Sequence, residues 1–170
     1  FAVKARDGSL WVEMAGKSAA PLHIKGANWA GFQQDGCVHE LWKHTVQDYI
    51  DFLTTHAFNA VRLPLSAPRI AANAAVGGSC GEYNGWLTLD ALEDVVDRLR
   101  AVGIFVVFDI HYITEDTSKT RLWCLNPHAC SPSDEKPLRD AWTALARRFC
   151  TKPNVLAADL FNEPHKATWG

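Results

Sequence analysis

The sequence lacks several features that mark other classes of protein. Its net charge at pH 7 is −2 over 170 residues, with acidic and basic residues interspersed, so there is no basic surface for nucleic acid. No apolar run approaches the ~20 residues that span a membrane. The first residues, FAVKARDGS, do not form the charged-then-apolar pattern of a signal peptide. What is left is a globular chain, whose length predicts one domain with a sizeable core.

Motifs for common cofactors and metals are also missing. No GxGxxG follows the first predicted strand, which argues against dinucleotide binding. Neither an HExxH motif nor a CxxC pair indicates zinc chemistry. We therefore expect no cofactor and no metal.

Five cysteines are present, and their spacing is not that of a zinc ribbon. An oxidising compartment suits them best, which predicts a secreted, extracellular protein with one thiol left over. We predict the pairs Cys124–Cys130 and Cys37–Cys80, which would leave Cys150 free. Spacing alone does not fix this connectivity.

The most informative stretch is 154–170, NVLAADLFNEPHKATWG. Its apolar run, Val155–Phe161, predicts a strand buried on both faces in a parallel sheet. Asn162 and Glu163 follow at the carboxyl end of that strand, and Pro164 turns the chain away. In parallel α/β barrels this edge carries the catalytic groups. The alternative is that both polar residues simply form a turn.

Short elements alternate along the chain. Apolar runs predict strands, the first of them in a hairpin that closes one end of the fold: Ser9–Met14, Leu22–Gly26, Asn59–Leu65, Ile104–Ile110 and Val155–Phe161. Helical spacing predicts helices over 46–57, 89–102 and 138–149, and Thr45 with Asp48 predicts the cap of the first. Long loops follow each strand, including 26–44, 71–85 and 112–133.

This βα alternation predicts an α/β fold with one parallel sheet. Two architectures compete, an open doubly wound sheet and a (β/α)8 barrel. Polar residues follow all four predicted parallel strands, which favours the barrel. Four strands are half of the number that a barrel needs, and closing one normally takes about 250 residues.

Five segments resemble, in order and spacing, the N-terminal half of family 5 glycoside hydrolases, most closely the cellulase-type endoglucanases. They are GANWAGFQ, HELW, NAVRLPLS, FDIHY and DLFNEPHKATWG. Asn-Glu-Pro alone is weakly specific, but its combination with Arg-Leu-Pro and Asp-x-His is specific. The resemblance runs from about Leu22 to the end of the chain. It implies a TIM barrel of which residues 1–170 supply the N-terminal half, about the first four β/α units plus an N-terminal hairpin, with no second domain.

The resemblance implies a retaining endo-β-1,4-glucanase that hydrolyses β-glucan without a cofactor. Glu163 matches the family's general acid/base, which protonates the departing glycosidic oxygen and then activates water. We expect burial at the strand end to raise the pKa of this carboxyl group. Asn162 matches the residue that binds the 2-hydroxyl of the sugar.

Arg62 matches the arginine that favours the ionised nucleophile in the family. A buried arginine needs a carboxylate partner, and a purely structural pair with Asp109 is the alternative. His111 matches the histidine that lines the sugar subsite at the cleavage point. Its alternative is an ordinary core histidine.

The aromatic residues in loops are candidates for stacking on sugar rings, which present flat C–H faces. Four tryptophans lie in or beside loops that follow strands: Trp29, Trp42, Trp123 and Trp169. We expect about half of them to be structural. His39 and His165 are candidates for the cleft, although ordinary loop roles are equally open.

The nucleophile of the family, a second carboxylate about 5 Å from the acid, has no counterpart here. Asp109 and Glu115 are poor substitutes. We expect the other half of the barrel to come from the same longer chain, a second chain or a homodimer. Two alternatives stay open: a mannanase or another β-glycanase on the same scaffold, and a non-catalytic carbohydrate-binding half-barrel.

Overall fold

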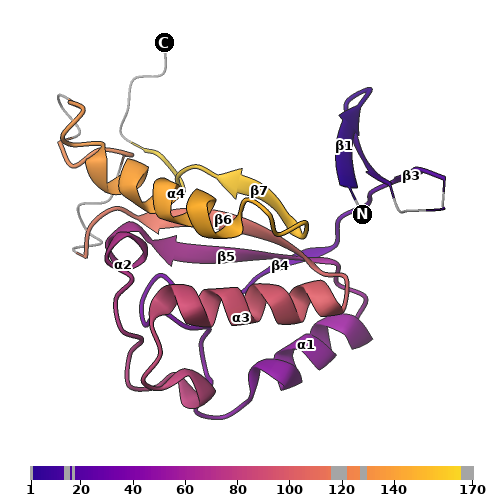
Figure 1. Cartoon of the computed structure of the whole chain (residues 1–170), viewed down its shortest axis with the longest axis horizontal. Coiled ribbons are helices and arrows are strands. Elements are labelled where there is room, and N and C mark those ends of the chain that lie inside the picture. The colour runs from indigo at the N-terminus through magenta and orange to yellow at the C-terminus, as the bar shows by residue number, and fades with distance from the viewer. Residues whose placement is uncertain (1, 14–15, 17, 116–121, 127–129, 166–170) are drawn as a thin grey trace.

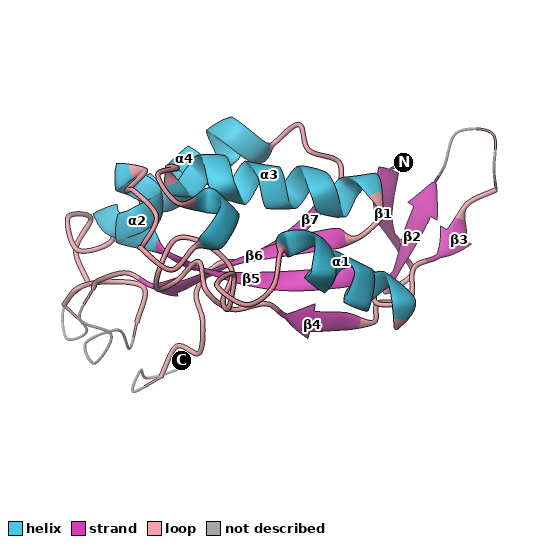
Figure 2. Ribbon diagram, turned by 90° about the horizontal axis from the view of Figure 1, so that it is seen from below, coloured by secondary structure: helices cyan, strands magenta, loops and turns pink. Residues whose placement is uncertain are grey.

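A four-stranded parallel sheet forms the centre of the structure, and helices cover one of its faces (Figures 1 and 2). The computed structural model describes residues 2–13, 16, 18–115, 122–126 and 130–165. The parallel sheet has the order β4-β5-β6-β7, with strands β4 (Gly26–Asn28), β5 (Ala60–Ser66), β6 (Phe105–Tyr112) and β7 (Val155–Asp159). Each neighbouring pair in this sheet is parallel, as the βα alternation predicted.

The helices occupy the connections between the parallel strands. They are α1 (Val46–Thr55), α2 (Ala67–Ala72), the 3-10 helix η1 (Gly81–Tyr83), α3 (Thr88–Ala101) and α4 (Lys136–Phe149). The three longer helices match the predicted ones within a few residues. Thr45 caps α1 as predicted, because its side chain accepts from the Asp48 N–H while the Asp48 carboxylate accepts from the Thr45 N–H. None of the helices among the described residues is long and apolar enough to span a membrane.

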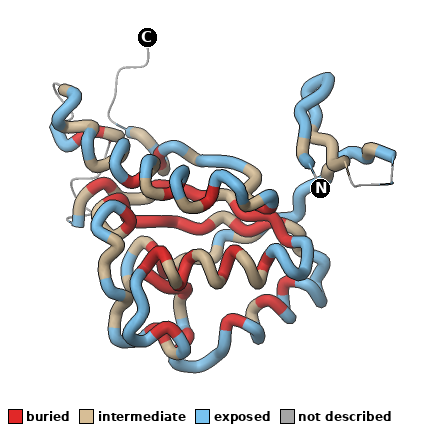
Figure 3. The backbone as a smooth tube through the Cα atoms, in the orientation of Figure 1, coloured by how far each residue is buried: buried red, intermediate tan, exposed pale blue. Residues whose placement is uncertain are grey.

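The two faces of the sheet differ, and this difference separates the two candidate architectures. Leu63, Phe108 and Ile110 are buried on the helix side, where Phe108 packs against Phe149 of α4 with ring centroids 5.1 Å apart. Arg62 and its register partner Val107 face the other side and are only half-buried. In Figure 3 the buried residues follow β5, β6 and the inner sides of the helices. Helices on a single face are the arrangement of a barrel wall rather than of a doubly wound sheet.

A separate antiparallel sheet precedes this wall and contains β1 (Ala2–Arg6), β2 (Ser9–Glu13) and β3 (Ala20–Pro21). Strands β1 and β2 meet at Asp7 and Gly8, which both have positive φ, as a tight hairpin turn requires. The predicted strand Ser9–Met14 thus corresponds to β2, which pairs with β3 as well as with β1, whereas β1 itself was not predicted. The hairpin projects beyond the N-terminal ends of the parallel strands (Figure 1), and its closure of that end of a complete barrel stays a prediction.

Two strand predictions need correction. The first parallel strand is Gly26–Asn28 and not Leu22–Gly26, because the segment pairs with β5 only from Gly26 onward. Strand β7 was predicted to be buried on both faces, but it forms the edge of the sheet. Ala157 and Ala158 are exposed and Leu160 is 66% exposed, since nothing in the described chain pairs with the outer side of β7.

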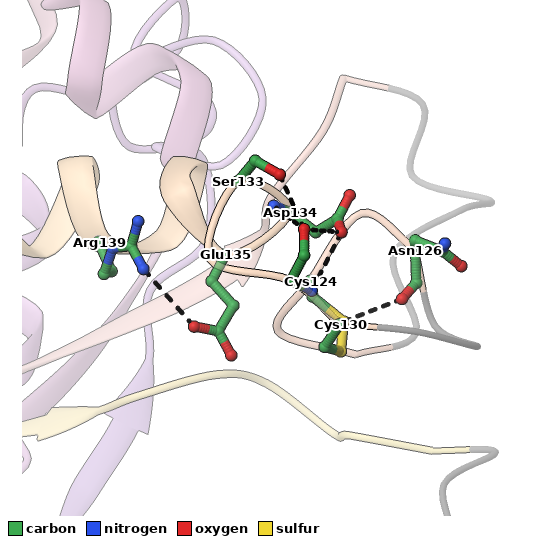
Figure 4. The surroundings of a disulfide bond; sticks show 8 residues. Cys124, Asn126, Cys130, Ser133, Asp134, Glu135 and Arg139 are labelled. Carbon is green, nitrogen blue, oxygen red and sulfur yellow. Dashed lines mark hydrogen bonds and ion pairs between the residues drawn. A yellow bond between two sulfur atoms is a disulfide. The ribbon is translucent and has the colours of Figure 1, made fainter.

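Both predicted disulfides are present. Cys37–Cys80 joins the loop after β4 to the segment before η1, and Cys124–Cys130 closes a small loop after β6. Figure 4 shows the second bridge, where the Asn126 carbonyl oxygen lies 3.3 Å from the Cys124 Sγ. Cys150 is free and exposed, as expected.

Candidate active site

Arg62 lies at the centre of a cluster of polar side chains on the open face of the sheet. Its Nε and Nη2 donate to the Oδ2 of Asp159, at 3.2 and 2.9 Å. Its Nη2 also lies 3.1 Å from the Oδ2 of Asp109, and its Nη1 donates to the Oδ1 of Asn28 at 3.3 Å. Two carboxylates therefore neutralise this half-buried cation, as a buried arginine requires.

Asp109 is the most deeply buried member of the cluster, with a side chain that is 0% exposed. Its Oδ2 also lies 2.7 Å from the Nδ1 of His111. Both residues come from β6, where positions two apart face the same side of the sheet. The predicted Arg62–Asp109 pair is thus present, and it is part of a larger network.

Asn162 joins β7 to this network. Its backbone N–H donates to the Ile110 carbonyl at 3.0 Å, which anchors the segment after β7 against β6. Its side-chain Oδ1 accepts from the Arg62 Nη2 at 2.9 Å, and its Nδ2 lies 3.4 Å from the His111 Nε2. The structure therefore brings together three sequence-predicted site residues, Arg62, His111 and Asn162.

Glu163 follows directly and is exposed, so the predicted burial of this acid is wrong for this chain. Its carboxylate has no hydrogen-bond or ion-pair partner among the described residues. Its φ is +44°, a backbone conformation that residues other than glycine rarely adopt. Residues with such a strained backbone are found more often at functional sites than elsewhere. The Glu163 carbonyl oxygen lies 2.9 Å from the Nδ1 of His165, which is itself exposed.

The loop aromatic residues do not all lie in the same kind of environment. Trp29 is half-buried and packs on Tyr49 of α1, with ring centroids 5.3 Å apart. Part of its side chain therefore contacts the hydrophobic core. Trp42 is 57% exposed, and the ammonium group of Lys43 lies 5.9 Å from the centre of its ring. His39 is half-buried. Trp169 lies outside the described residues.

Trp123 lines a pocket of about 420 Å³ beside the carboxyl end of β7. Asp159, Phe161 and Pro164 line the same pocket, so it adjoins the segment that carries Asn162 and Glu163. Trp123 directly precedes Cys124 of the Cys124–Cys130 bridge. Of the four predicted tryptophans, Trp123 is thus placed next to the polar cluster.

Two members of the cluster were not predicted from the sequence. Asp159 and Asn28 bind the Arg62 guanidinium from either side. Asp159 was read as part of an apolar strand, although a charged residue within such a run is itself a signal. Register decides its role, because Asp159 pairs with Asp109 across the β6–β7 ladder.

The sequence matches the family model described as Cellulase (glycosyl hydrolase family 5) over residues 16–170. Among curated relatives, an endoglucanase of Paenibacillus polymyxa is 27% identical over 96% of this chain and 41% of its own length. The major extracellular endoglucanase of Xanthomonas campestris is 31% identical over 90% of this chain and 32% of its own length.

Solved structures agree with these matches. A cellotetraose complex of a variant endocellulase from Pyrococcus horikoshii superposes with a TM-score of 0.82 at 27% identity, over 99% of this chain and 45% of that one. The catalytic domain of the Xanthomonas campestris endoglucanase gives a TM-score of 0.74 at 31% identity, over 89% of this chain and 44% of that one. The chain therefore spans less than half the length of the relatives that it matches.

Proposed function

Because this chain belongs to the cellulases of glycosyl hydrolase family 5, we propose that it forms part of a retaining endo-β-1,4-glucanase. The substrate is a β-1,4-linked glucan, cut by double displacement. The observation that carries the proposal is the arrangement at the end of β7, where Asn162 is held by Arg62 and His111. The exposed Glu163 follows, and its carboxylate has no partner within the described part of the chain. The cellotetraose complex of the Pyrococcus horikoshii endocellulase supports the choice of substrate class.

Each residue has a distinct role in this mechanism. Glu163 protonates the departing glycosidic oxygen and afterwards removes a proton from the attacking water. Asn162 and His111 position the glycone sugar, with Asn162 at the 2-hydroxyl group. Arg62 stabilises the charge of a nucleophilic carboxylate about 5 Å from Glu163, the spacing of retaining enzymes.

Residues outside these 170 supply that nucleophile in our proposal. Further β/α units pair with the outer side of β7, cover the open face of the sheet and complete the barrel. Trp123, Trp42, Trp29 and Trp169, with His39 and His165, contribute to the walls of the sugar-binding groove. Two disulfides and the extracellular Xanthomonas campestris relative support a secreted protein.

The variant Glu163→Gln tests the central assignment in the intact enzyme. We expect reducing-sugar release from soluble cellulose to fall by about 10²–10⁴-fold, the usual contribution of general acid–base catalysis. The release of an activated aryl group from an aryl cellobioside should suffer much less, since that group leaves without protonation. Added azide should raise the turnover of the aryl cellobioside by Glu163→Gln, because azide attacks the glycosyl-enzyme intermediate without help from a general base.

Glu115→Gln is the matched control, because Glu115 is another exposed acid in a loop after a parallel strand. It should leave hydrolysis of soluble cellulose nearly unchanged. Unchanged cellulose turnover in Glu163→Gln, or an equal loss in Glu115→Gln, would contradict the assignment. If the unmodified enzyme releases reducing sugar faster from soluble mannan than from soluble cellulose, the proposed mechanism stands but the substrate is a mannan.

A further inference from the structure

Four side chains on the open face of the sheet form a closed ring of polar contacts. Arg62 contacts Asp109 (Nη2 to Oδ2, 3.1 Å), and Asp109 contacts His111 (Oδ2 to Nδ1, 2.7 Å). His111 contacts Asn162 (Nε2 to Nδ2, 3.4 Å), and Asn162 returns to Arg62 (Oδ1 to Nη2, 2.9 Å). The members come from β5, β6 and the segment after β7, so the ring exists only in the folded sheet.

The direction of every hydrogen bond in this ring follows from one fact, that a guanidinium group only donates. The atom of Asn162 that faces Arg62 must therefore be the carbonyl oxygen, and its NH2 group must face His111. Since that NH2 group donates, the His111 Nε2 must accept and carries no proton. A neutral imidazole then holds its proton on Nδ1.

Asp109 leads to the same tautomer from the other side of the ring. A carboxylate accepts hydrogen bonds, so the His111 Nδ1–H donates to the Asp109 Oδ2 across 2.7 Å. The Asp109 side chain is 0% exposed, and its Oδ1 has no hydrogen-bond partner among the described residues. The one oxygen that is engaged thus serves both Arg62 and His111.

We propose that Asp109 is a positioning residue, which holds His111 as the Nδ1–H tautomer and, through Arg62 and His111, fixes the amide of Asn162 with its NH2 group toward the groove. Asp109 does not touch the substrate and acts through its neighbours. A buried carboxylate that orients a histidine in this way is a recurring device in active sites.

The consequence for the sugar rests on the proposed function. One hydrogen of the Asn162 NH2 group is used by the His111 Nε2, and the other remains to donate to the 2-hydroxyl oxygen of the glycone sugar. The His111 Nε2 is an acceptor and can take a hydrogen bond from the sugar in place of the 3.4 Å contact. The site therefore offers one donor and one acceptor with fixed directions.

Nuclear magnetic resonance tests the tautomer without any measurement of activity. The intact protein is labelled with ¹⁵N at histidine, and long-range ¹H–¹⁵N correlations are recorded at pH 8, with His111 assigned by comparison with His111→Gln. We expect Nδ1 to carry the proton and Nε2 to appear as the unprotonated nitrogen. A protonated Nε2 with a bare Nδ1 in the unmodified protein would overturn the proposal, whatever the protein hydrolyses.

Two variants separate the hydrogen-bond acceptor of Asp109 from its charge. Asp109→Asn keeps an acceptor for the Nδ1–H, so the tautomer should stay. Asp109→Ala removes the acceptor while Arg62 retains Asp159. Only the long 3.4 Å contact with the Asn162 Nδ2 then favours this tautomer, so the signals of His111 should shift to those of a tautomer mixture. An unchanged tautomer in Asp109→Ala, with the signals of the other histidines showing a folded protein, would overturn the role of Asp109.

A third variant covers the case in which Asp109→Ala does not fold. Asn162→Asp offers an acceptor to the His111 Nε2 in place of a donor, and a proton should appear on Nε2.

In the active enzyme, Asp109→Ala should lower kcat on cello-oligosaccharides by about 10²-fold, the effect of a small misplacement of a catalytic group, with a smaller change in KM. The exposed control Asp140→Ala should leave both constants unchanged. Loss of the tautomer without loss of kcat would refute only the link to sugar hydrolysis.

Discussion

At the scale of single residues, two carboxylates share the Arg62 guanidinium group on the open face of the sheet. Arg62 lies between Asp109 and Asp159, and these two carboxylates differ in burial, at 0% and 39% exposed. A charge that is buried loses far more hydration than one at the surface, so its partner matters more. The Arg62–Asp109 pair is therefore expected to matter to stability as well as to the site.

This difference predicts unequal costs for two substitutions. Arg62→Met leaves Asp109 buried beside a neutral histidine, and we expect the free energy of unfolding to fall by about 3–5 kcal/mol. Asp159→Asn leaves Arg62 paired with Asp109, and we expect a loss of about 1 kcal/mol or less. Urea denaturation at pH 7 measures both. Equal costs would show that the guanidinium group does not compensate the buried acid.

At the scale of elements, α3 and α4 are joined by ion pairs along their exposed sides. Glu93 of α3 accepts from Arg148 of α4 and from Lys152 just beyond it, at 2.7–2.8 Å. The pKa of the Glu93 carboxyl group lies below its ordinary value. The main cause is the hydrogen bond from Lys152, followed by the hydrogen bond from Arg148. Lys152 also binds Asp97 at 2.7 Å, so the contacts form a network.

This depressed pKa sets the sign of a pH effect. A carboxyl group with a lower pKa in the folded state than in the unfolded state stabilises the fold above its unfolded pKa of about 4.3. That contribution is lost as the pH falls through the lower, folded pKa. We therefore expect Glu93→Gln to lower stability at pH 7 and to show a smaller further loss between pH 5 and 2 than the parent, measured by urea midpoints. The exposed control Asp51→Asn should show the same change of urea midpoint with pH as the parent. If the urea midpoint of Glu93→Gln falls with pH as steeply as that of the parent, the assigned role of Glu93 is wrong.

The two disulfides differ in the length of chain that they close, 43 residues for Cys37–Cys80 and 6 for Cys124–Cys130. Restricting the unfolded chain predicts about 4 kcal/mol of stabilisation for the first bridge and about 2 kcal/mol for the second. The double variants Cys37→Ser/Cys80→Ser and Cys124→Ser/Cys130→Ser should show this order in guanidinium denaturation. The reverse order would mean that native contacts, rather than loop length, govern their effect.

At the scale of the whole molecule, the described chain is a barrel wall whose sheet ends in two edge strands, β4 and β7. Strand β7 forms one edge of the sheet, and Leu160 beyond it is 66% exposed. An apolar pocket of about 260 Å³ opens beside it, lined by residues of α4, β6 and β7 that include Trp142 and Phe108. Unpaired strand edges next to apolar surface promote association between chains.

A polypeptide of these 170 residues alone is therefore expected to self-associate as its concentration rises. Leu160→Lys places a charge beside the open edge and should shift sedimentation velocity profiles toward the monomer. Val102→Lys is the control, because Val102 is an exposed apolar residue at the end of α3, away from this edge. Equal shifts in both variants would show that general charge, and not the edge, controls association.

Much of the local structure could be predicted from the sequence alone. The helices α1, α3 and α4 follow from apolar residues at helical spacing, and the α1 cap follows from Thr45 and Asp48, since neighbours along the chain form these contacts. The cores of β5 and β6 follow from their apolar runs. The Asn162-Glu163-Pro164 segment with its companion motifs was sufficient to indicate the family, which the family match confirms.

Other features depended on the folded sheet. Periodicity did not indicate α2, which begins directly after β5, nor a strand as short as Gly26–Asn28, whose pairing with β5 defines it. The exposure of β7 and Glu163 depends on what lies beside the strand, which the residues of the strand do not encode. The ring around Arg62 joins side chains up to 100 positions apart, and only strand register decides which of them face the same side. Local sequence thus determined the elements and the motif, while tertiary structure decided which polar atoms meet, because those contacts depend on distances that no local pattern specifies.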